Sequence, residues 1–396
     1  LVDSSTQIIA RYDDPEAVGR ASASESKLFP PFVLTQTIDI RFEELVHDAK
    51  RKGLSSNEFY QQLVGCEYDE AWSKLVLMGR PSWDRVEHDD WDKKEAAYRV
   101  IKRAADKLLC GRPPPMGSGS FNQDSRFGVA SVLCRLGLQP SSWSRLASQA
   151  VAEFLATLVH VTVSHDQFVI TYTSEPVLTF GAACVWYRST TRDDPHARLA
   201  EHILPHFRRS VLSRDTLSTS GKHGDLVSRL LLLLAMDATG VVVSPSDYSP
   251  LPSRFAREYA GQFHSVETFL GVLYGDHPLV VRDGKLNDAT STFGASVRDM
   301  LQGWREWKVG FSHFLQVTTE PSEDELWAML ARRAAGVFPH SYDDVDLFIP
   351  IFNGTAVSMI LIQTATRPGG ELPLVARLMR PSSLFSNAFS QQSPSA

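Results

Sequence analysis

The sequence predicts a mixed α/β protein, with a helical front half followed by an α/β domain. Two observations lead to this prediction. Apolar residues recur at helical spacing through most of residues 42–159, and two short apolar segments flank an Asn-Gly pair near residue 353. A third observation is composition, because 43% hydrophobic and 22% charged residues are typical of chains that fold around a core. The 396 residues are enough for two or three domains of ordinary size.

We expect four segments along the chain. Small and polar residues at 20–27 indicate that ordered structure begins near Pro30, and Pro, Gly and Ser accumulate again after Arg367. The predicted segments are a linker or strand-like part at 1–29, a mainly helical domain at 30–212, an α/β domain at 213–381 and a flexible tail at 382–396. Because the chain begins at Leu1 and has no initiator methionine, we also expect it to be part of a larger protein.

Helical spacing dominates the predicted front half, and Ser or Asp near several segment starts can serve as N-caps. Helices are expected from residue 42 onward and at 56–63, 69–78, 91–110, 141–159 and 197–212. Residues 160–173 alternate around a Ser-His-Asp-Gln turn, which predicts a β-hairpin between the last two helices.

The predicted back half begins with a strongly apolar helix that Asp225 opens. The expected elements are helices at 224–238, 266–274 and 323–335 and strands at 311–317, 346–352 and 356–363. The last two strands flank Asn353-Gly354, a pair typical of a tight hairpin turn. A hairpin at this place is the clearest structural signal in the sequence.

Charge and cysteine content limit the function classes. A net charge of −6 gives no general attraction to nucleic acid, so such binding would need a local basic surface. The cysteines form no CxxC pair, which favours reduced thiols in an intracellular protein, nuclear or cytoplasmic. They are Cys66, Cys110, Cys134 and Cys184. The longest aliphatic run, at 230–236, is far shorter than the ~18 residues of a membrane helix, so we expect no membrane span.

Two aspartates and a glutamine occupy positions of chemical interest in the back half. Asp225 begins the apolar helix, Asp346 precedes a buried strand, and Gln363 lies near the end of the next strand. Metal-dependent nucleases bind Mg²⁺ with carboxylates at strand ends and use a lysine to help position or activate water. Helix capping and turn formation are alternative roles for the same residue types at these positions.

Five stretches carry a resemblance to a known family. They are residues 30–35 (PPFVLT), 224–235, 311–314 (FSHF), 346–351 (DLFIPI) and 358–363 (SMILIQ). On these stretches the chain resembles large fungal proteins of the Crinkler and retrotransposon-hot-spot group, in which a P-loop ATPase is followed by a PD-(D/E)xK nuclease-like domain. The resemblance implies a restriction-endonuclease-like α/β domain at 213–381 and an ATPase region that this chain lacks.

The same resemblance assigns roles to individual residues. It implies that Asp346 matches the metal-binding aspartate, Asp225 the helix glutamate, and Gln363 the acid or glutamine of the final strand. Ala365 stands where the family has its catalytic lysine. We therefore expect a catalytically degenerate nuclease-like protein with a nucleic-acid-binding or regulatory role. No cofactor is expected, and Mg²⁺ at Asp225 and Asp346 only if activity remains.

Phosphate binding requires basic side chains that converge in space. The expected nucleic-acid-binding residues are Arg229, Arg332, Arg333 and Arg367. The partners considered are DNA or RNA bound through such a basic surface, a protein partner, and the absent ATPase region. No membrane partner is expected.

Two other function classes stay open at this point. A protein-interaction or self-recognition module is favoured if tryptophans gather on one exposed face, the candidates being Trp83, Trp91, Trp304 and Trp307. An enzyme of unrelated chemistry would show a deep pocket with converging His, Asp and Arg side chains away from Asp346.

Overall fold

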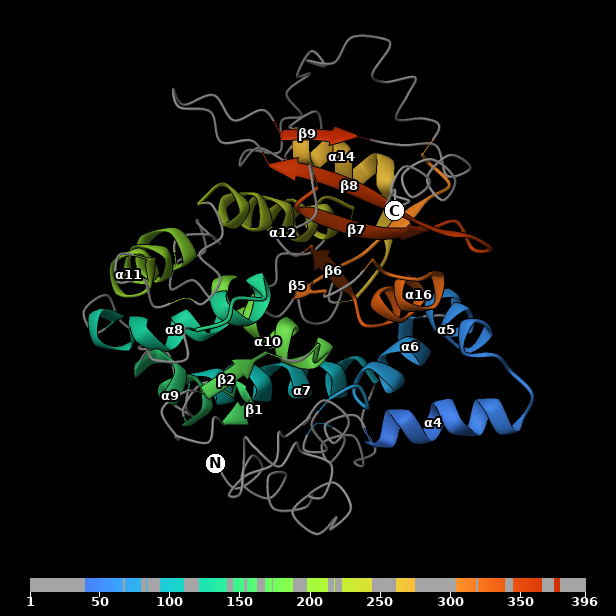
Figure 1. Cartoon of the computed structure of the whole chain (residues 1–396), viewed down its shortest axis with the longest axis horizontal. Helices are drawn as coiled ribbons and strands as arrows, with labels where there is room; N and C mark the ends of the chain where they lie inside the picture. Colours follow the sequence, from blue (N-terminus) through green and yellow to red (C-terminus); the bar gives the residue numbers. More distant parts are fainter. Residues whose placement is uncertain are drawn as a thin grey trace, which may run out of the picture. The chain divides into compact units, whose positions relative to one another are not determined.

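Figure 1 shows the computed structural model of the chain. The structure describes residues 40–66, 68–79, 83, 93–109, 121–140, 145–152, 155–161, 168–172, 174–187, 198–212, 217, 223–243, 261–274, 304–317, 320–338, 345–364 and 374–377. The chain divides into two compact units. Unit 1 comprises Leu1–Leu54, Cys66–Ser220 and Ser246–Gly261, and unit 2 comprises Ser55–Gly65, Gly221–Pro245 and Gln262–Ala396.

The division differs from the predicted domains at three places: unit 2 resumes at Gly221, Ser246–Gly261 belongs to unit 1, and Ser55–Gly65 belongs to unit 2. The segment Ser55–Gly65 belongs to unit 2, although it lies far from the rest of that unit in the sequence. It forms α5 (Ser56–Gly65), which buries Phe59, Leu63 and Val64 and packs against α16 (Glu323–Ala331). The apolar face of α5 therefore packs against a helix that follows it by more than two hundred residues in the sequence. The predicted linker at 1–29 and tail at 382–396 lie outside the described residues.

Unit 1 is mainly helical, as the sequence predicts. Its elements are α4 (Ile40–Arg51), α6 (Tyr68–Leu75), α7 (Lys93–Leu108), α8 (Phe121–Leu136), α9 (Arg145–Ala152), β1 (Thr157–Val161), β2 (Phe168–Thr171), α10 (Pro176–Tyr187), the π-helix η2 (Arg198–Ile203) and α11 (Leu204–Ser210). Helix α10 packs against both α7 and α8. A Cβ at Gly181 of α10 would lie 2.7 Å from both the Cβ of Ala104 and the backbone nitrogen of Ala105, so a glycine permits this close approach.

The helices α8 and α10 are absent from the sequence-based prediction, and their burial explains why. Ser131 and Arg135 of α8 are as buried as its apolar residues, so the described part of this helix presents no polar face. Both contact Trp186 of α10, whose indole N–H donates to the Ser131 hydroxyl at 2.9 Å. The guanidinium carbon of Arg135 lies 4.2 Å from the centre of the Trp186 ring. A helix buried on most sides lacks the amphipathic pattern that periodicity detects.

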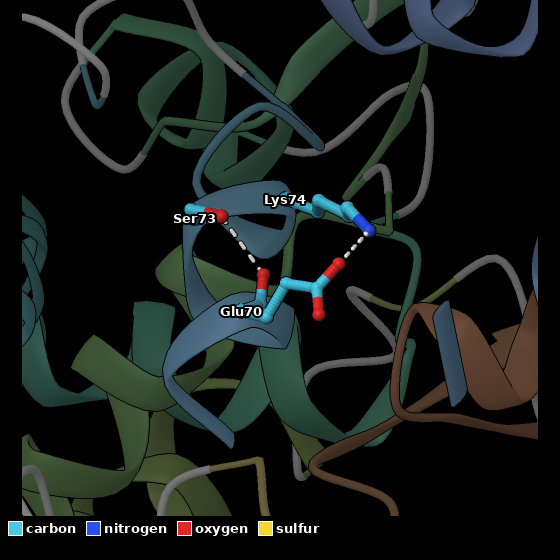
Figure 2. A network of polar contacts seen from close by, with 3 residues as sticks. All are labelled: Glu70, Ser73 and Lys74. Carbon is cyan, nitrogen blue, oxygen red and sulfur yellow. Dashed lines mark hydrogen bonds and ion pairs between the residues drawn. The ribbon is translucent and has the colours of Figure 1, made fainter. Parts of the chain in front are cut away.

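Exposed helices of unit 1 carry local polar contacts instead. Figure 2 shows the example on α6, where Lys74 Nζ donates to Glu70 Oε1 at 2.8 Å, one helical turn away. On the same helix, the hydroxyl of Ser73 donates to the backbone carbonyl of Glu70 at 2.8 Å. Because the Glu70 side chain is 60% exposed and that of Lys74 26% exposed, such a pair contributes only about 0.3–0.5 kcal/mol.

The hairpin predicted at 160–173 is confirmed, while the preceding helix is shorter than predicted. Strands β1 and β2 pair antiparallel with Thr157 opposite Thr171. Helix α9 ends at Ala152, and Leu155 has a φ of 61°. A left-handed residue stops an α-helix, and the segment after it is extended. The prediction of one helix over 141–159 is therefore wrong in its last part.

Unit 2 combines helices with a curled mixed sheet. Its further elements are α12 (His223–Val243), β3 (His264–Ser265), α14 (Val266–Tyr274), β4 (Lys308–Val309), β5 (His313–Gln316), β6 (Ala334–Val337), β7 (Leu347–Phe352), β8 (Val357–Thr364) and β9 (Leu374–Arg377). The strand order is β3-β4-β7-β6-β5, with β8 paired to β7 and β9. Of these pairs, β5 with β6 is parallel and the others are antiparallel.

Strand β7 is the centre of this sheet. All of its residues are buried, and β8 pairs along its whole length. On the other edge, β6 pairs with Leu347 and Phe348 at the start of β7, and β4 pairs with Ile351 and Phe352 at its end. Figure 1 shows β7, β8 and β9 as neighbouring strands, and α12 packs against both α14 and β8. This packing positions the first turn of α12 near the end of β8.

The hairpin predicted around Asn353-Gly354 is confirmed. The side-chain oxygen of Asn353 accepts from the backbone N–H groups of Thr355 at 3.2 Å and Ala356 at 2.9 Å. Gly354 has a φ of 97°, a conformation that a glycine adopts without steric cost. The turn therefore fixes the register in which Asp346 and Thr364 meet at the opposite end of β7 and β8.

The helix predicted at 323–335 is correct at its start and wrong at its end. Ser322 caps α16 by accepting from the backbone N–H of Glu325, whose carboxylate accepts from the backbone of Ser322 in return. The helix ends at Ala331 because Arg333 adopts a φ of 57°. Residues Ala334–Val337 then form β6, although their alanines favour a helix in isolation. Pairing with β5 and β7 overrides that propensity.

No helix in the described parts of the chain combines the length and apolarity needed to cross a bilayer. Cys134 and Cys184 are buried free thiols, and Cys66 is a half-buried one. Cys110 lies outside the described residues.

Candidate functional site

Asp225 lies in the first turn of α12, and its side chain is buried. The exposed peptide N–H groups of a helix start favour a negative charge there. Such a position alone is common for an aspartate, but only 2% of this residue is exposed. A buried carboxylate needs hydrogen bonds or an opposite charge to offset the loss of water. The partners of Asp225 therefore decide what this residue does.

Asp346 is held in place by both strands that flank it. Its backbone N–H donates to the carbonyl of Ile362 at 3.0 Å, and its own carbonyl accepts from the N–H of Phe338 at 2.9 Å. These two bonds tie the residue before β7 to β8 and to the end of β6. The half-buried carboxylate of Asp346 thus projects from a backbone that has little freedom to move.

Thr364, the last residue of β8, joins the two carboxylates. Its hydroxyl oxygen lies 2.5 Å from Oδ1 of Asp225 and 2.7 Å from Oδ2 of Asp346. Its backbone N–H also donates to Oδ2 of Asp346 at 2.6 Å. We refer to Asp225, Asp346 and Thr364 as the acidic cluster. Because a hydroxyl carries one hydrogen, it donates to one carboxylate at a time, so the two acids compete for it.

Arg229 supplies positive charge beside the acidic cluster. It lies one helical turn after Asp225, which places both side chains on the same face of α12. Only 2% of Arg229 is exposed. Burial lowers its pKa to about 10, and the negative charges of Asp225 and Asp346 act in the opposite direction. Arg229 therefore stays a cation at neutral pH, within the electrostatic field of both acids.

The structure thus brings together two of the predicted catalytic residues, Asp225 and Asp346, and it separates the third from them. Gln363 is adjacent to Thr364 in β8, where it pairs with Val375 of β9. Successive side chains of a strand point to opposite faces of the sheet, so Gln363 faces away from the side on which Thr364 meets the carboxylates. Ala365 lies outside the described residues. Sequence reasoning selected Gln363 and overlooked Thr364.

The predicted nucleic-acid-binding arginines differ in how exposed they are. Arg229 and Arg333 are buried, which contradicts a role on an exposed phosphate-binding surface. Arg332 is half-buried, and Arg367 lies outside the described residues. The guanidinium of Arg333 donates to the carbonyls of Leu330 at 2.8 Å and Ala331 at 3.3 Å, at the end of α16. It also lies 3.8 Å from the ring centre of Phe263, so Arg333 stabilises the fold.

Three of the four tryptophans considered for a protein-binding face are buried. Trp83 is fully buried, and Trp304 and Trp307 are each 8% exposed. Trp304 and Trp307 contact each other with ring centres 5.8 Å apart. Trp91 lies outside the described residues. The exposed aromatic cluster that would favour an interaction module is therefore not formed by the three that the structure describes.

Asp225 and Asp346 are the carboxylates that a Mg²⁺ ion would use, and their surroundings do not fit such an ion. Oδ2 of Asp346 already accepts from the N–H of Thr364 and shares the Thr364 hydroxyl with Asp225. The nearby positive charge comes from Arg229. Mg²⁺ demands six nearly octahedral oxygen ligands and usually retains several waters, whereas Asp225 is almost wholly buried. The acidic cluster is arranged for hydrogen bonding within the protein.

Comparison of the chain with protein-family models, with curated proteins and with solved structures finds no match.

Proposed function

We propose that unit 2 derives from a PD-(D/E)xK nuclease, has lost cleavage, and serves a nucleic-acid-binding or regulatory role. The observation that carries this proposal is the meeting of Asp225 and Asp346 at Thr364. A helix acid and a strand-start acid converge at the end of a β-hairpin, which is the arrangement that the sequence resemblance implies. Asp225 and Asp346 are separated by more than a hundred residues in the sequence, so the fold, and not their position along the chain, brings them together.

Three features support the loss of cleavage. The oxygen of Asp346 that faces the cluster is engaged by Thr364. Gln363, in the position of the strand acid, lies on the other face of β8. Ala365 has no ammonium group with which to position or activate a water molecule. Hydrolysis of a phosphodiester requires charge neutralisation and an oriented nucleophile together, and this set of residues supplies neither in full.

Binding of nucleic acid would use exposed basic side chains of unit 2. Arg305 and Lys308 are exposed, and Arg332 is half-buried. Arg305 is weakly paired, because its Nε lies 3.9 Å from the Glu267 carboxylate with most of the side chain in solvent. Each phosphate contact adds about one counterion to those released on binding, so affinity should fall steeply with salt.

The experiment combines cleavage and filter binding on single- and double-stranded DNA and RNA, with Mg²⁺ and with Mn²⁺. The proposal predicts binding without cleavage for the wild type and for Asp346→Ala. Arg332→Glu should weaken binding at low salt, while Glu323→Gln, which removes an exposed acid from the first turn of the helix that Arg332 caps, should not. Cleavage that disappears in Asp346→Ala would refute the loss of activity. Absence of any binding would refute the nucleic-acid role.

The second candidate is a self-recognition module. Val227 and Leu231 of α12 are 44% and 49% exposed, and they lie one helical turn apart on one face. A second copy of the chain could cover this apolar pair. Sedimentation of the wild type and of Leu231→Lys distinguishes the candidates, because self-recognition predicts a dimer that the charged variant loses. A monomer in both would leave the nucleic-acid role as the better account.

A further inference from the structure

The acidic cluster places two carboxylates close together in a site that is largely shielded from water. Asp225 is 2% exposed, and its Oδ1 lies 2.5 Å from a hydroxyl that a second carboxylate shares. Two carboxylates near one another in a poorly hydrated site repel, and each loses hydration free energy on burial. A nuclease offsets this repulsion with a divalent cation. The same residues without a cation need another source of positive charge.

The spacing of the oxygen atoms around Thr364 is that of hydrogen bonds. Neighbouring ligands of Mg²⁺ lie about 3.0 Å apart when each is roughly 2.1 Å from the metal in octahedral geometry. The hydroxyl oxygen of Thr364 is closer than this to both carboxylates, at 2.5 and 2.7 Å. Separations of this length are typical of O–H···O⁻ hydrogen bonds, and the single hydrogen of the Thr364 hydroxyl serves one carboxylate at a time.

Arg229 has the properties that the cluster requires. It is buried at 2% exposure, shares a helix face with Asp225, and interacts electrostatically with both Asp225 and Asp346. Two carboxylates and one guanidinium have a total formal charge of −1, so the guanidinium neutralises the charge of one carboxylate. An isolated buried guanidinium would be costly, and the two acids are what make its burial tolerable.

We infer that Arg229 is a built-in counter-ion of the Asp225–Asp346 pair, taking the electrostatic place of the divalent cation on which a nuclease would depend. This inference deepens the proposed function and rests on it for the comparison with a metal-dependent site. Its consequence is specific: the wild-type protein should not bind a divalent cation at these aspartates, and removal of the Arg229 charge should create that binding.

The test is a titration of the full chain with Mn²⁺, followed by electron paramagnetic resonance, without nucleic acid. We expect no saturable binding below millimolar Mn²⁺ for the wild type or for the charge-conserving Arg229→Lys. Arg229→Gln should bind Mn²⁺ at least tenfold more tightly, and Arg229→Gln with Asp346→Asn should lose that gain. The matched control Arg332→Gln removes a half-buried arginine of the same unit and should behave as the wild type.

Saturable Mn²⁺ binding by the wild type that Asp346→Asn abolishes would overturn the inference, as would no gain in Arg229→Gln. If Arg229→Gln does not fold without metal, recovery of its far-UV circular dichroism on addition of Mn²⁺ supports the inference, and no recovery overturns it. Because nucleic acid is absent from the titration, this result is independent of whether the proposed nucleic-acid binding is found.

Discussion

The hydroxyl of Thr364 lies 2.5 Å from the carboxylate of Asp225, although 139 residues separate the two in the sequence. Asp346 meets the same hydroxyl at 2.7 Å. One side chain at the end of β8 thus links the start of α12 to the start of β7. The fold of unit 2 and the candidate site depend on the same contact, so a change at this position should be measurable as a change in stability.

Replacement of Thr364 by valine should destabilise the protein by about 1–3 kcal/mol, because it leaves two carboxylates without their shared donor at nearly unchanged volume. Thr364→Ser keeps the hydroxyl and should lose distinctly less stability. Urea unfolding of both variants at pH 7 provides the measurement. Equal effects of valine, which loses the hydroxyl, and serine, which loses the methyl group, would contradict a dominant role of the hydroxyl at this position.

The pairing of β6 with β7 can be tested at Gly336. A Cβ at this position would overlap the aromatic ring of Phe348, which lies directly opposite on β7. Gly336→Ala should therefore cost about 1–3 kcal/mol or more of unfolding free energy. Gly65→Ala, where nothing lies within 4 Å of the new Cβ, should be close to neutral. A neutral Gly336→Ala would contradict the register of these strands.

Stability should also depend on His264, which is buried at the start of β3. Burial lowers its pKa from 6.5 to about 4. As the pH falls from about 6.5 toward 4, the unfolded chain binds a proton that the folded chain does not. The free energy of unfolding therefore decreases in this window, by at most about 1.4 kcal/mol per pH unit from this group.

The contribution of His264 is isolated by comparison with His264→Gln, which cannot take up the proton. Between pH 7 and pH 4.5, the wild type should lose about 2 kcal/mol more unfolding free energy than the variant. Urea unfolding at the two pH values gives both differences. A loss of the same size in the two proteins would contradict a neutral, buried His264.

The sequence predicts the part of unit 2 that local chemistry dictates. Asn353-Gly354 identifies the β7–β8 hairpin because its turn needs those residue types. Once the hairpin is known, Asp346 and the end of β8 must be neighbours. The choice between Gln363 and Thr364 then depends on which face of the strand is inward, and a nearly continuous apolar strand does not reveal it. For that reason the sequence pattern does not single out Thr364 as the residue that meets the two carboxylates.

Long-range packing determines the features of unit 2 that could not be predicted from the sequence. Spacing places Arg229 one turn from Asp225, but whether that face is exposed or buried depends on α12 packing against β8. The alanines of 334–335 favour a helix locally and become a strand because they pair with β5, while the next two residues of β6 pair with β7. In each case the deciding contact comes from a distant part of the chain.

A double-mutant cycle between Arg229 and Asp346 tests most directly whether the cluster is one electrostatic unit. Asp346→Asn keeps the acceptor oxygen for Thr364 and removes the charge, and Arg229→Met removes the guanidinium at similar length. In the wild-type background Arg229→Met should cost about 3–5 kcal/mol, because buried carboxylates lose their counter-charge. In the Asp346→Asn background it should cost at least about 1 kcal/mol less. Equal costs in the two backgrounds would contradict the assignment of Arg229 as the counter-ion of this pair.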